Sequence, residues 1–159
     1  MDYEFGNQEI EAMTQWVTFM LEGEKYGIDV MHVKEVLRDI EIAPVPGAPP
    51  YVLGIINLRG NVVTVVDTRS RFNLPPREID DNTRVIVIET EDQSLGLLVD
   101  QIAEVADIPK SGIEMTPNLS TDDNSKFIMG VYSAKGDLII LVDMGKLLGE
   151  EESMDGDLY

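Results

Sequence analysis

Short apolar runs separated by turn-forming residues follow one another along most of the chain. Runs of this kind, rich in β-branched residues and bounded by glycine or acidic turns, predict strands joined as hairpins. Four hairpins are expected, at residues 16–21 with 26–30, 53–58 with 62–67, 83–89 with 94–99, and 128–133 with 138–143. Short strands at this spacing are typical of sandwiches and small barrels, so the chain is predicted to be mostly β.

Few segments between these hairpins favour another structure. Residues 31–37 combine good helix formers with apolar positions and predict one or two helical turns. Residues 68–72 predict a short helix behind Asp67, which is expected to cap it, and Asp143 is expected to do the same later in the chain. Residues 44–50 predict a stiff proline loop, 105–108 an extended segment, and 109–125 a longer irregular stretch.

The pattern of the chain repeats itself. Residues 51–72 align without a gap on residues 127–148, and residues 26–36 find a second echo in residues 95–105. Two copies in the same order indicate one supersecondary unit used twice. We therefore expect two small β-barrels packed together with a few short helices, a junction near residues 73–83, and a groove where the halves meet. Sequence order alone leaves open whether strands cross from one barrel to the other.

Charge narrows the possible partners. The 159 residues carry a formal net charge of −18, and half of it lies in residues 1–13 and 149–159, which contain no lysine or arginine. Residues 1–13 and 150–159 are expected to be flexible ends that flank a folded region at residues 14–149. An acidic body disfavours nucleic acid and anionic membrane as partners. The chain has no cysteine and no apolar run long enough for a membrane span, so a soluble cytoplasmic protein is expected.

Candidate catalytic and metal-binding residues are few. His32 is the sole histidine and, with no second histidine or cysteine, is interpreted as a solvated surface residue. Asp67 and Asp143, one in each repeat, suggest an aspartic-protease pair, but Arg69 and Met144 replace residues which that chemistry needs, so helix capping is favoured. The acidic clusters at residues 80–81 and 122–124 lack calcium-loop spacing. We expect no catalytic site, no metal and no cofactor.

Several short motifs resemble those of a known family, the CheW-like adaptors of bacterial chemotaxis. They are Y-G-I-D-V at 26–30, V-x-E-V at 33–36, A-P-V-P at 43–46, G-I-I-N-L-R-G at 54–60, V-D-T-R at 66–69 and L-G-L-L-V-D at 95–100. The resemblance covers roughly residues 14–148, and N-L-R-G at a hairpin tip is its strongest single element. It implies two five-stranded β-barrels around a shared core, in agreement with the duplication.

The resemblance also implies a non-catalytic scaffold that couples methyl-accepting chemoreceptors to the histidine kinase CheA. Its expected partners are the regulatory domain of CheA, the cytoplasmic receptor tip and other CheW-like domains in array rings. Receptor-contacting charges would be Glu35 and Arg59. The neighbouring or coupling-sensitive positions would be Val33, Asn57, Leu58, Gly54 and Val105, and Leu119 would lie at the kinase or ring contact.

Two alternatives remain beside this interpretation. The first is a CheW-like coupling protein of a parallel chemosensory system, such as one for twitching motility. The second, from a different class, is a small acidic β-barrel hydrolase, which the lack of a catalytic constellation disfavours.

Overall fold

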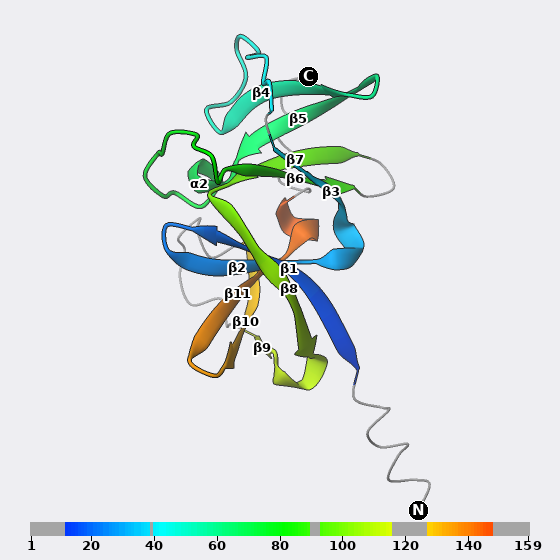
Figure 1. The fold of residues 1–159 in the computed structure, drawn as a ribbon, viewed down its shortest axis with the longest axis vertical. Coiled ribbons are helices and arrows are strands. Elements are labelled where there is room, and N and C mark those ends of the chain that lie inside the picture. Colours follow the sequence, from blue (N-terminus) through cyan, green and yellow to red (C-terminus); the bar gives the residue numbers. More distant parts are fainter. Residues whose placement is uncertain (1–11, 39, 90–92, 116–126, 148–159) are drawn as a thin grey trace, which may run out of the picture.

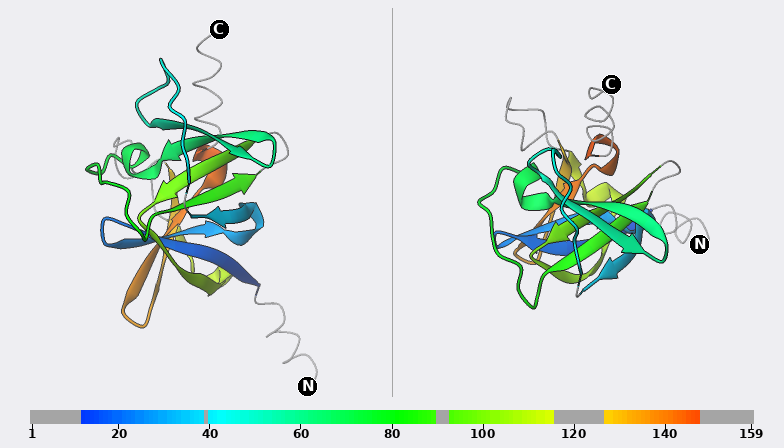
Figure 2. Two further views of the ribbon diagram at one scale, coloured as in Figure 1. Left: turned by 45° about the horizontal axis from the view of Figure 1, so that its top comes forward. Right: turned by 90° about the horizontal axis from the view of Figure 1, so that it is seen from above.

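The fold consists of two β-sheets packed one on the other, seen in a computed structural model (Figure 1). The structure describes residues 12–38, 40–89, 93–115 and 127–147. Sheet A has the strand order β8-β1-β2-β11-β10-β9, and sheet B has the order β3-β6-β7-β5-β4. Figure 2 shows the two layers from two further directions, with sheet B above sheet A in the left view. The prediction of a mostly β fold in two packed units is confirmed.

Sheet A combines strands from both ends of the chain. Its members are β1 (Met13–Leu21), β2 (Glu24–Asp29), β8 (Gln101–Pro109), β9 (Glu114–Met115), β10 (Ile128–Ala134) and β11 (Asp137–Val142). The sheet is mainly antiparallel, but β11 pairs with β2 in parallel. Its sixth strand, β9, has only two residues and adds to the five strands per barrel that the family resemblance implied.

Sheet B is formed by the middle of the chain. Its members are β3 (Val33–Leu37), β4 (Val52–Leu58), β5 (Asn61–Asp67), β6 (Arg84–Glu89) and β7 (Ser94–Val99). Here too one pair is parallel, between β5 and β7. The short helix α2 (Thr68–Arg71) follows β5. The 3₁₀ turns η1 (Val30–His32) and η2 (Lys110–Gly112) precede β3 and β9.

The two repeats exchange hairpins. The β1–β2 hairpin comes from the first repeat but pairs with β8 and β11 of the second, while β6–β7 of the second repeat pairs with β3 and β5 of the first. The sequence left this question open, and the structure answers it. Each sheet is therefore built from both repeats, and neither repeat contains a complete sheet of its own.

Both exchanged hairpins sit in the same register. Tyr26 opposes Ile140 in sheet A, and the corresponding pair in sheet B, 69 and 76 positions away, is Leu95 with Thr64. A register shift between Val17 and Phe19 in the β1–β8 pair is matched in the β3–β6 pair. Because a one-residue slip would turn every apolar side chain to the wrong face, the duplication has preserved register together with bulges.

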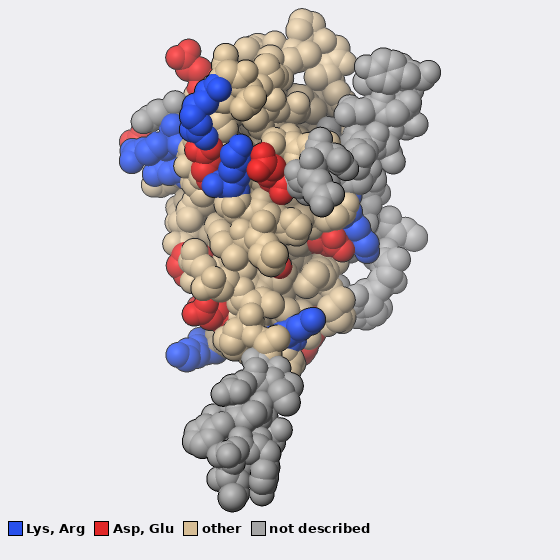
Figure 3. Space-filling model, turned by 90° about the vertical axis from the view of Figure 1, so that its right-hand side faces the viewer, with Lys and Arg blue, Asp and Glu red and all other residues tan. Residues whose placement is uncertain are grey.

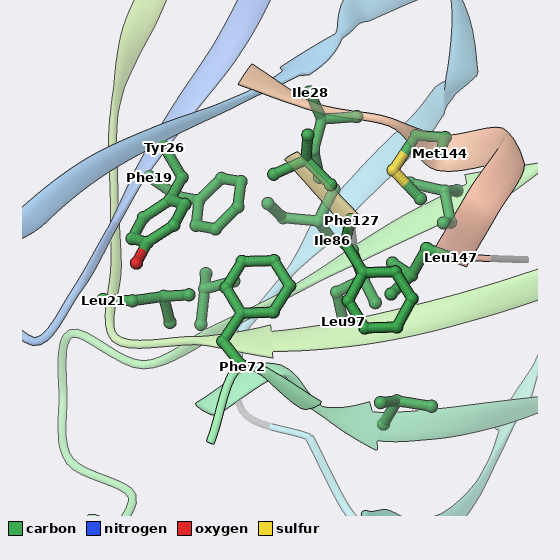
Figure 4. Packing of buried hydrophobic residues seen from close by; sticks show 14 of the residues in the cluster. Phe19, Leu21, Tyr26, Ile28, Phe72, Ile86, Leu97, Phe127, Met144 and Leu147 are labelled. Carbon is green, nitrogen blue, oxygen red and sulfur yellow. The ribbon is translucent and has the colours of Figure 1, made fainter. Parts of the chain in front are cut away.

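The main hydrophobic core lies where the two sheets meet. Phe19 stacks on Tyr26, and Phe72 stacks on Phe127 with ring centroids 6.0 Å apart (Figure 4). Other members come from both sheets and from the helical turn at residues 144–147: Leu21, Ile28, Val66, Ile86, Ile88, Leu95, Leu97, Val99, Val142, Met144 and Leu147. This core fills the interior between the two sheets, and the groove expected where the halves meet stays a prediction.

Local structure agrees with the sequence at most positions and differs at one. Residues 31–37 were expected to be helical, but only η1 is, and Val33–Leu37 is a strand. Its alternating burial and its partner β6 show why: strand pairing satisfies the backbone of an amphipathic segment that is too short for a stable helix. The helix expected at 68–72 is confirmed as α2. None of the helices in the described residues has the length and apolar character that a membrane crossing requires.

Candidate functional site

The β4–β5 hairpin ends in a tight turn that presents Arg59 at its tip. Arg59 and Gly60 both have positive φ, 52° and 88°, and Leu58 pairs with Asn61 across them. Two positive φ values define the turn type whose twist matches that of the strands. The side-chain oxygen of Asn57 accepts a hydrogen bond from the Gly60 amide at 2.9 Å. The sequence predicted a hairpin tip at this position.

Arg59 and Glu35 form an ion pair with each other. The guanidinium of Arg59 donates to the Glu35 carboxylate, although the two residues belong to different edges of sheet B. The Arg59 side chain is 66% exposed and that of Glu35 is 25% exposed. The sequence predicted that both residues serve one surface, and the structure does bring them together. The sequence did not predict that Arg59 and Glu35 contact one another directly, where the two edges of sheet B approach each other.

A hollow of about 730 Å³ lies next to this pair. Asn57 and Leu58 line it from β4, Val62 lines it from β5, and the segment that follows Glu35 closes the other side. The remaining lining residues are Leu37, Arg38, Ile40, Glu41, Ile42, Ala43, Ile55 and Ile56. Most of the lining residues are aliphatic, and the charged residues Arg38 and Glu41 lie among them. Figure 3 shows charges of both signs side by side over the upper half of the molecule, which holds sheet B.

Gly54 supports the hollow from beneath and is itself buried. Its φ is +152°, and a Cβ placed on it would lie 2.2 Å from the carbonyl oxygen of Ala43. Ala43 exchanges two backbone hydrogen bonds with Ile55, of 2.8 and 2.9 Å, so this strand crossing needs a residue without a side chain. Gly54 thus positions one wall of the hollow and does not form part of the accessible surface.

The other positions taken from the family resemblance fall in different places. Val33 is half-buried and packs against the main core, whereas Val105 is 55% exposed on β8 of sheet A. Leu119 lies outside the described residues. The structure therefore brings Glu35, Arg59, Asn57 and Leu58 into one region and places Val105 on the other sheet.

The candidate catalytic aspartates have a structural role. One oxygen of Asp67 accepts from the Arg69 amide at 3.1 Å, and one oxygen of Asp143 accepts from the Lys146 amide at 3.2 Å. Burial raises the pKa of Asp67, while hydrogen bonds from the Arg69 and Ser70 amides oppose that rise. Each aspartate caps its own helical turn, as expected. In the described ranges, no three His, Cys, Asp or Glu side chains are grouped so as to hold a metal ion.

A buried ion pair that sequence reasoning missed joins the two sheets. Arg69 is 6% exposed and binds Asp100 through two hydrogen bonds of 2.7 Å. It also contacts Glu22 in the β1–β2 turn at 2.6 Å, and Arg77 reaches Asp100 at 3.2 Å. Asp100 stands where the chain leaves sheet B for sheet A. Both residues occur in family motifs at 66–69 and 95–100, but nothing in their spacing indicates a mutual contact.

The network keeps Asp100 ionised. Burial, the largest single influence, would raise the pKa of Asp100, but the hydrogen bonds from Arg69 and the Glu22 amide and the positive charges of Arg69 and Arg77 together lower it, so the net shift is downward. The same carboxylate raises the pKa of Arg69. A buried charge pair with this many hydrogen bonds costs a great deal to break, because each partner would be left uncompensated.

The chain resembles known proteins over nearly its whole length. The family model of the CheW-like domain matches residues 15–152. Chemotaxis protein CheW of Bacillus subtilis is 36% identical over 91% of this chain and 93% of its own length. Protein FrzA of Myxococcus xanthus is 29% identical over 78% of each chain. The crystal structure of scaffolding protein TtCheW from Thermoanaerobacter tengcongensis superposes with a TM-score of 0.77 at 35% identity, covering 82% of this chain and 89% of that one.

These similarities confirm the expectation of a chemotaxis scaffold over that of a hydrolase. Such a scaffold acts by binding and not by catalysis, and the similarity to FrzA agrees with the alternative of a parallel chemosensory system. The chain belongs to the CheW-like domain family.

Proposed function

We propose that this protein couples chemoreceptors to the histidine kinase CheA, and that the surface around Glu35 and Arg59 receives the cytoplasmic tip of the receptor. The observation that carries the proposal is the exposed Arg59–Glu35 ion pair beside the hollow next to β4. An amphipathic helix binds by placing apolar side chains in such a groove and polar ones on its border. The site of action is then the cytoplasm, at receptor arrays in the membrane.

The kinase partner is assigned to other surfaces. CheA would bind through its regulatory domain, which is itself homologous to this family, and further CheW-like domains would complete rings. The pseudo-symmetry of the duplicated fold favours a head-to-tail contact with a homologous domain, and such contacts close into rings or extend into arrays. Leu119 keeps its proposed place at this contact.

A charge substitution tests the receptor assignment. Arg59→Ala and Glu35→Ala should each weaken binding of a purified receptor tip by about 1–3 kcal/mol, the usual scale for truncating a well-placed interface charge. Lys135→Ala is the matched control, because Lys135 occupies the equivalent turn of sheet A with nearly the same φ. Titrations against the receptor tip and, separately, against the kinase regulatory domain measure the effect. Equal loss of both partners would contradict a dedicated receptor surface.

A double variant with the two charges swapped distinguishes direct contact with the receptor from structural support of the hollow. In Glu35→Arg combined with Arg59→Glu the ion pair can re-form with reversed polarity. If the residues only hold the hollow open, receptor binding returns to the wild-type value. If they contact the receptor, as proposed, binding stays weak.

The parallel-system alternative is supported by the similarity to FrzA. Reconstitution separates the two. With chemotaxis receptor and CheA, the addition of this chain at micromolar concentration should raise kinase activity far above that of kinase plus receptor. An unchanged rate with chemotaxis components would favour the parallel system.

A further inference from the structure

The two sheets carry equivalent pockets, one closed and one open. The pocket of sheet B is lined by Thr83, Leu98, Asp67 and Arg69. The pocket of sheet A is lined by the residues at the corresponding positions of the other repeat, which are, in the same order, Thr14, Asp29, Asp143 and Gly145. The first two pairs are 69 positions apart in the sequence and the last two are 76 apart. All four equivalent pairs line both pockets. The hairpin exchange and its shared register place them at the same point of each fold.

The closed pocket is filled by an arginine, and the open one lacks it. In sheet B the Arg69 guanidinium lies on Asp100 and donates to the carbonyl of Pro75 at 2.6 Å, leaving a cavity of about 10 Å³. In sheet A, Gly145 occupies the position that corresponds to Arg69, and Met31 occupies the position that corresponds to Asp100. Met31 is 86% exposed. A hollow of about 280 Å³ remains.

The open hollow presents groups that suit an incoming cation. Asp29 and Asp143 contribute carboxylates, each of which uses one oxygen for a backbone amide at its own turn. A Cβ on Gly145 would lie 3.3 Å from an oxygen of Asp143, so this carboxylate borders the space that an arginine fills in sheet B. Trp16, Met129 and Ile113 form an apolar wall.

We propose that this hollow, which we term the open pocket, receives an arginine side chain from a partner protein. The partner would supply in trans the kind of group that sheet B supplies in cis, with Asp29 and Asp143 in place of Asp100, the carboxylate that holds Arg69 in sheet B. Arginine suits the pocket better than lysine, because its planar group binds carboxylates through several donors held in a fixed geometry. The proposal rests on the duplication and is independent of the receptor surface at Glu35 and Arg59.

A small arginine analogue is the probe for the open pocket. N-acetyl-arginine amide is titrated into the full chain and followed by the fluorescence of Trp16, the only tryptophan, and by backbone amide NMR shifts. A ligand of this size should saturate with a Kd of roughly 1–20 mM. N-acetyl-citrulline amide has nearly the same shape without the charge and should give no saturable response. An equal response to citrulline, or none to arginine up to about 100 mM, would overturn the proposal.

Substitutions locate the site. Asp29→Asn and Asp143→Asn keep a capping side chain and remove only the charge, so each should weaken the probe about 3–10-fold without unfolding the protein. Gly145→Arg supplies the missing side chain in cis and should abolish the response, whereas Gly145→Ala should retain it. Full binding to Gly145→Arg would show that the probe binds elsewhere.

Lys110 provides a test of whether the open pocket prefers a cation or an anion. It lines the same hollow and opposes a cation. Lys110→Gln should therefore tighten the arginine probe about 2–3-fold, the scale of a partly screened charge interaction. Weaker binding in this variant, or a preference for acetate over the arginine probe, would identify an anion site and overturn the proposal.

Discussion

The two sheets share a backbone and differ in their chemistry. Strand order around the exchanged hairpin, register and bulges are the same in both. In sheet B Glu35 is bound by Arg59, whereas its counterpart in sheet A, Glu104, is bound by Lys25 at 3.0 Å. The duplication has thus kept what burial and backbone pairing require, and the surface and pocket side chains have diverged.

The pocket positions should show the largest difference between the sheets. Asp100→Ala leaves Arg69 buried without its carboxylate and should lower the free energy of unfolding by about 3–5 kcal/mol. Met31→Ala alters the equivalent position of sheet A, where the side chain is exposed, and should change the free energy of unfolding by less than about 0.5 kcal/mol. Urea unfolding of both variants measures the contrast. Similar losses in both would mean that the two pockets are equally important for stability.

The bulge glycines should give a smaller contrast. A Cβ would lie 2.2 Å from a backbone oxygen at Gly54 and 2.6 Å at Gly130, and only Gly54 also has a positive φ. Overpacking of this kind costs about 1–3 kcal/mol, so Gly54→Ala should fall near the upper value and Gly130→Ala near the lower one. Thermal melting monitored by circular dichroism ranks them. The reverse order would show that backbone strain at Gly54 is unimportant.

Acid should weaken the buried ion pair between Arg69 and Asp100. The pKa of Asp100 is lowered on folding, so its stabilisation is present above the unfolded pKa of about 3.9 and is lost as pH falls through the lower folded value. Asp67 has a raised pKa and acts in the opposite direction. Between about pH 5 and pH 2 the free energy of unfolding should decline, and Asp100→Asn should flatten that decline. Urea unfolding at a series of pH values tests this, and parallel curves would exclude Asp100 as the source.

His32 should show almost no effect. Its counterpart in the second repeat is Gln101, at the start of β8, so His32→Gln copies one repeat into the other at an incompletely buried position. The free energy of unfolding should change by less than about 0.5 kcal/mol, and stimulation of the kinase should be retained. A several-fold loss of stimulation with an intact fold would show that the histidine has a role in coupling.

Local features were predictable because neighbouring residues determine them. The hairpin turn at Arg59–Gly60 and the capping by Asp67 and Asp143 depend on a few adjacent side chains and were expected from the sequence. The duplication was visible because apolar positions recur at fixed spacing. Residues 31–37 were mistaken for helix because their partner strand β6 lies some 50 residues away and local propensity does not include it.

Contacts between distant segments were not predictable in the same way. The Arg69–Asp100 pair depends on how the hairpins are exchanged, and sequence order left that exchange open. The Arg59–Glu35 pair depends on how sheet B curls to bring its two edges together. Family resemblance identified Glu35 and Arg59 as important but gave no reason for their pairing, and the structure supplies one.

The hairpin exchange has a consequence for synthesis on the ribosome. Strand β2 ends at residue 29, but its parallel partner β11 begins at residue 137, which is 108 positions later. At about 5–20 residues per second, the β1–β2 hairpin waits roughly 5–20 s with an unpaired edge. Sheet B can complete itself once β7 has emerged, so it is expected to form first and shield part of that waiting hairpin. The order of translation then sets the order of folding, and sheet A closes only when nearly the whole chain has been made.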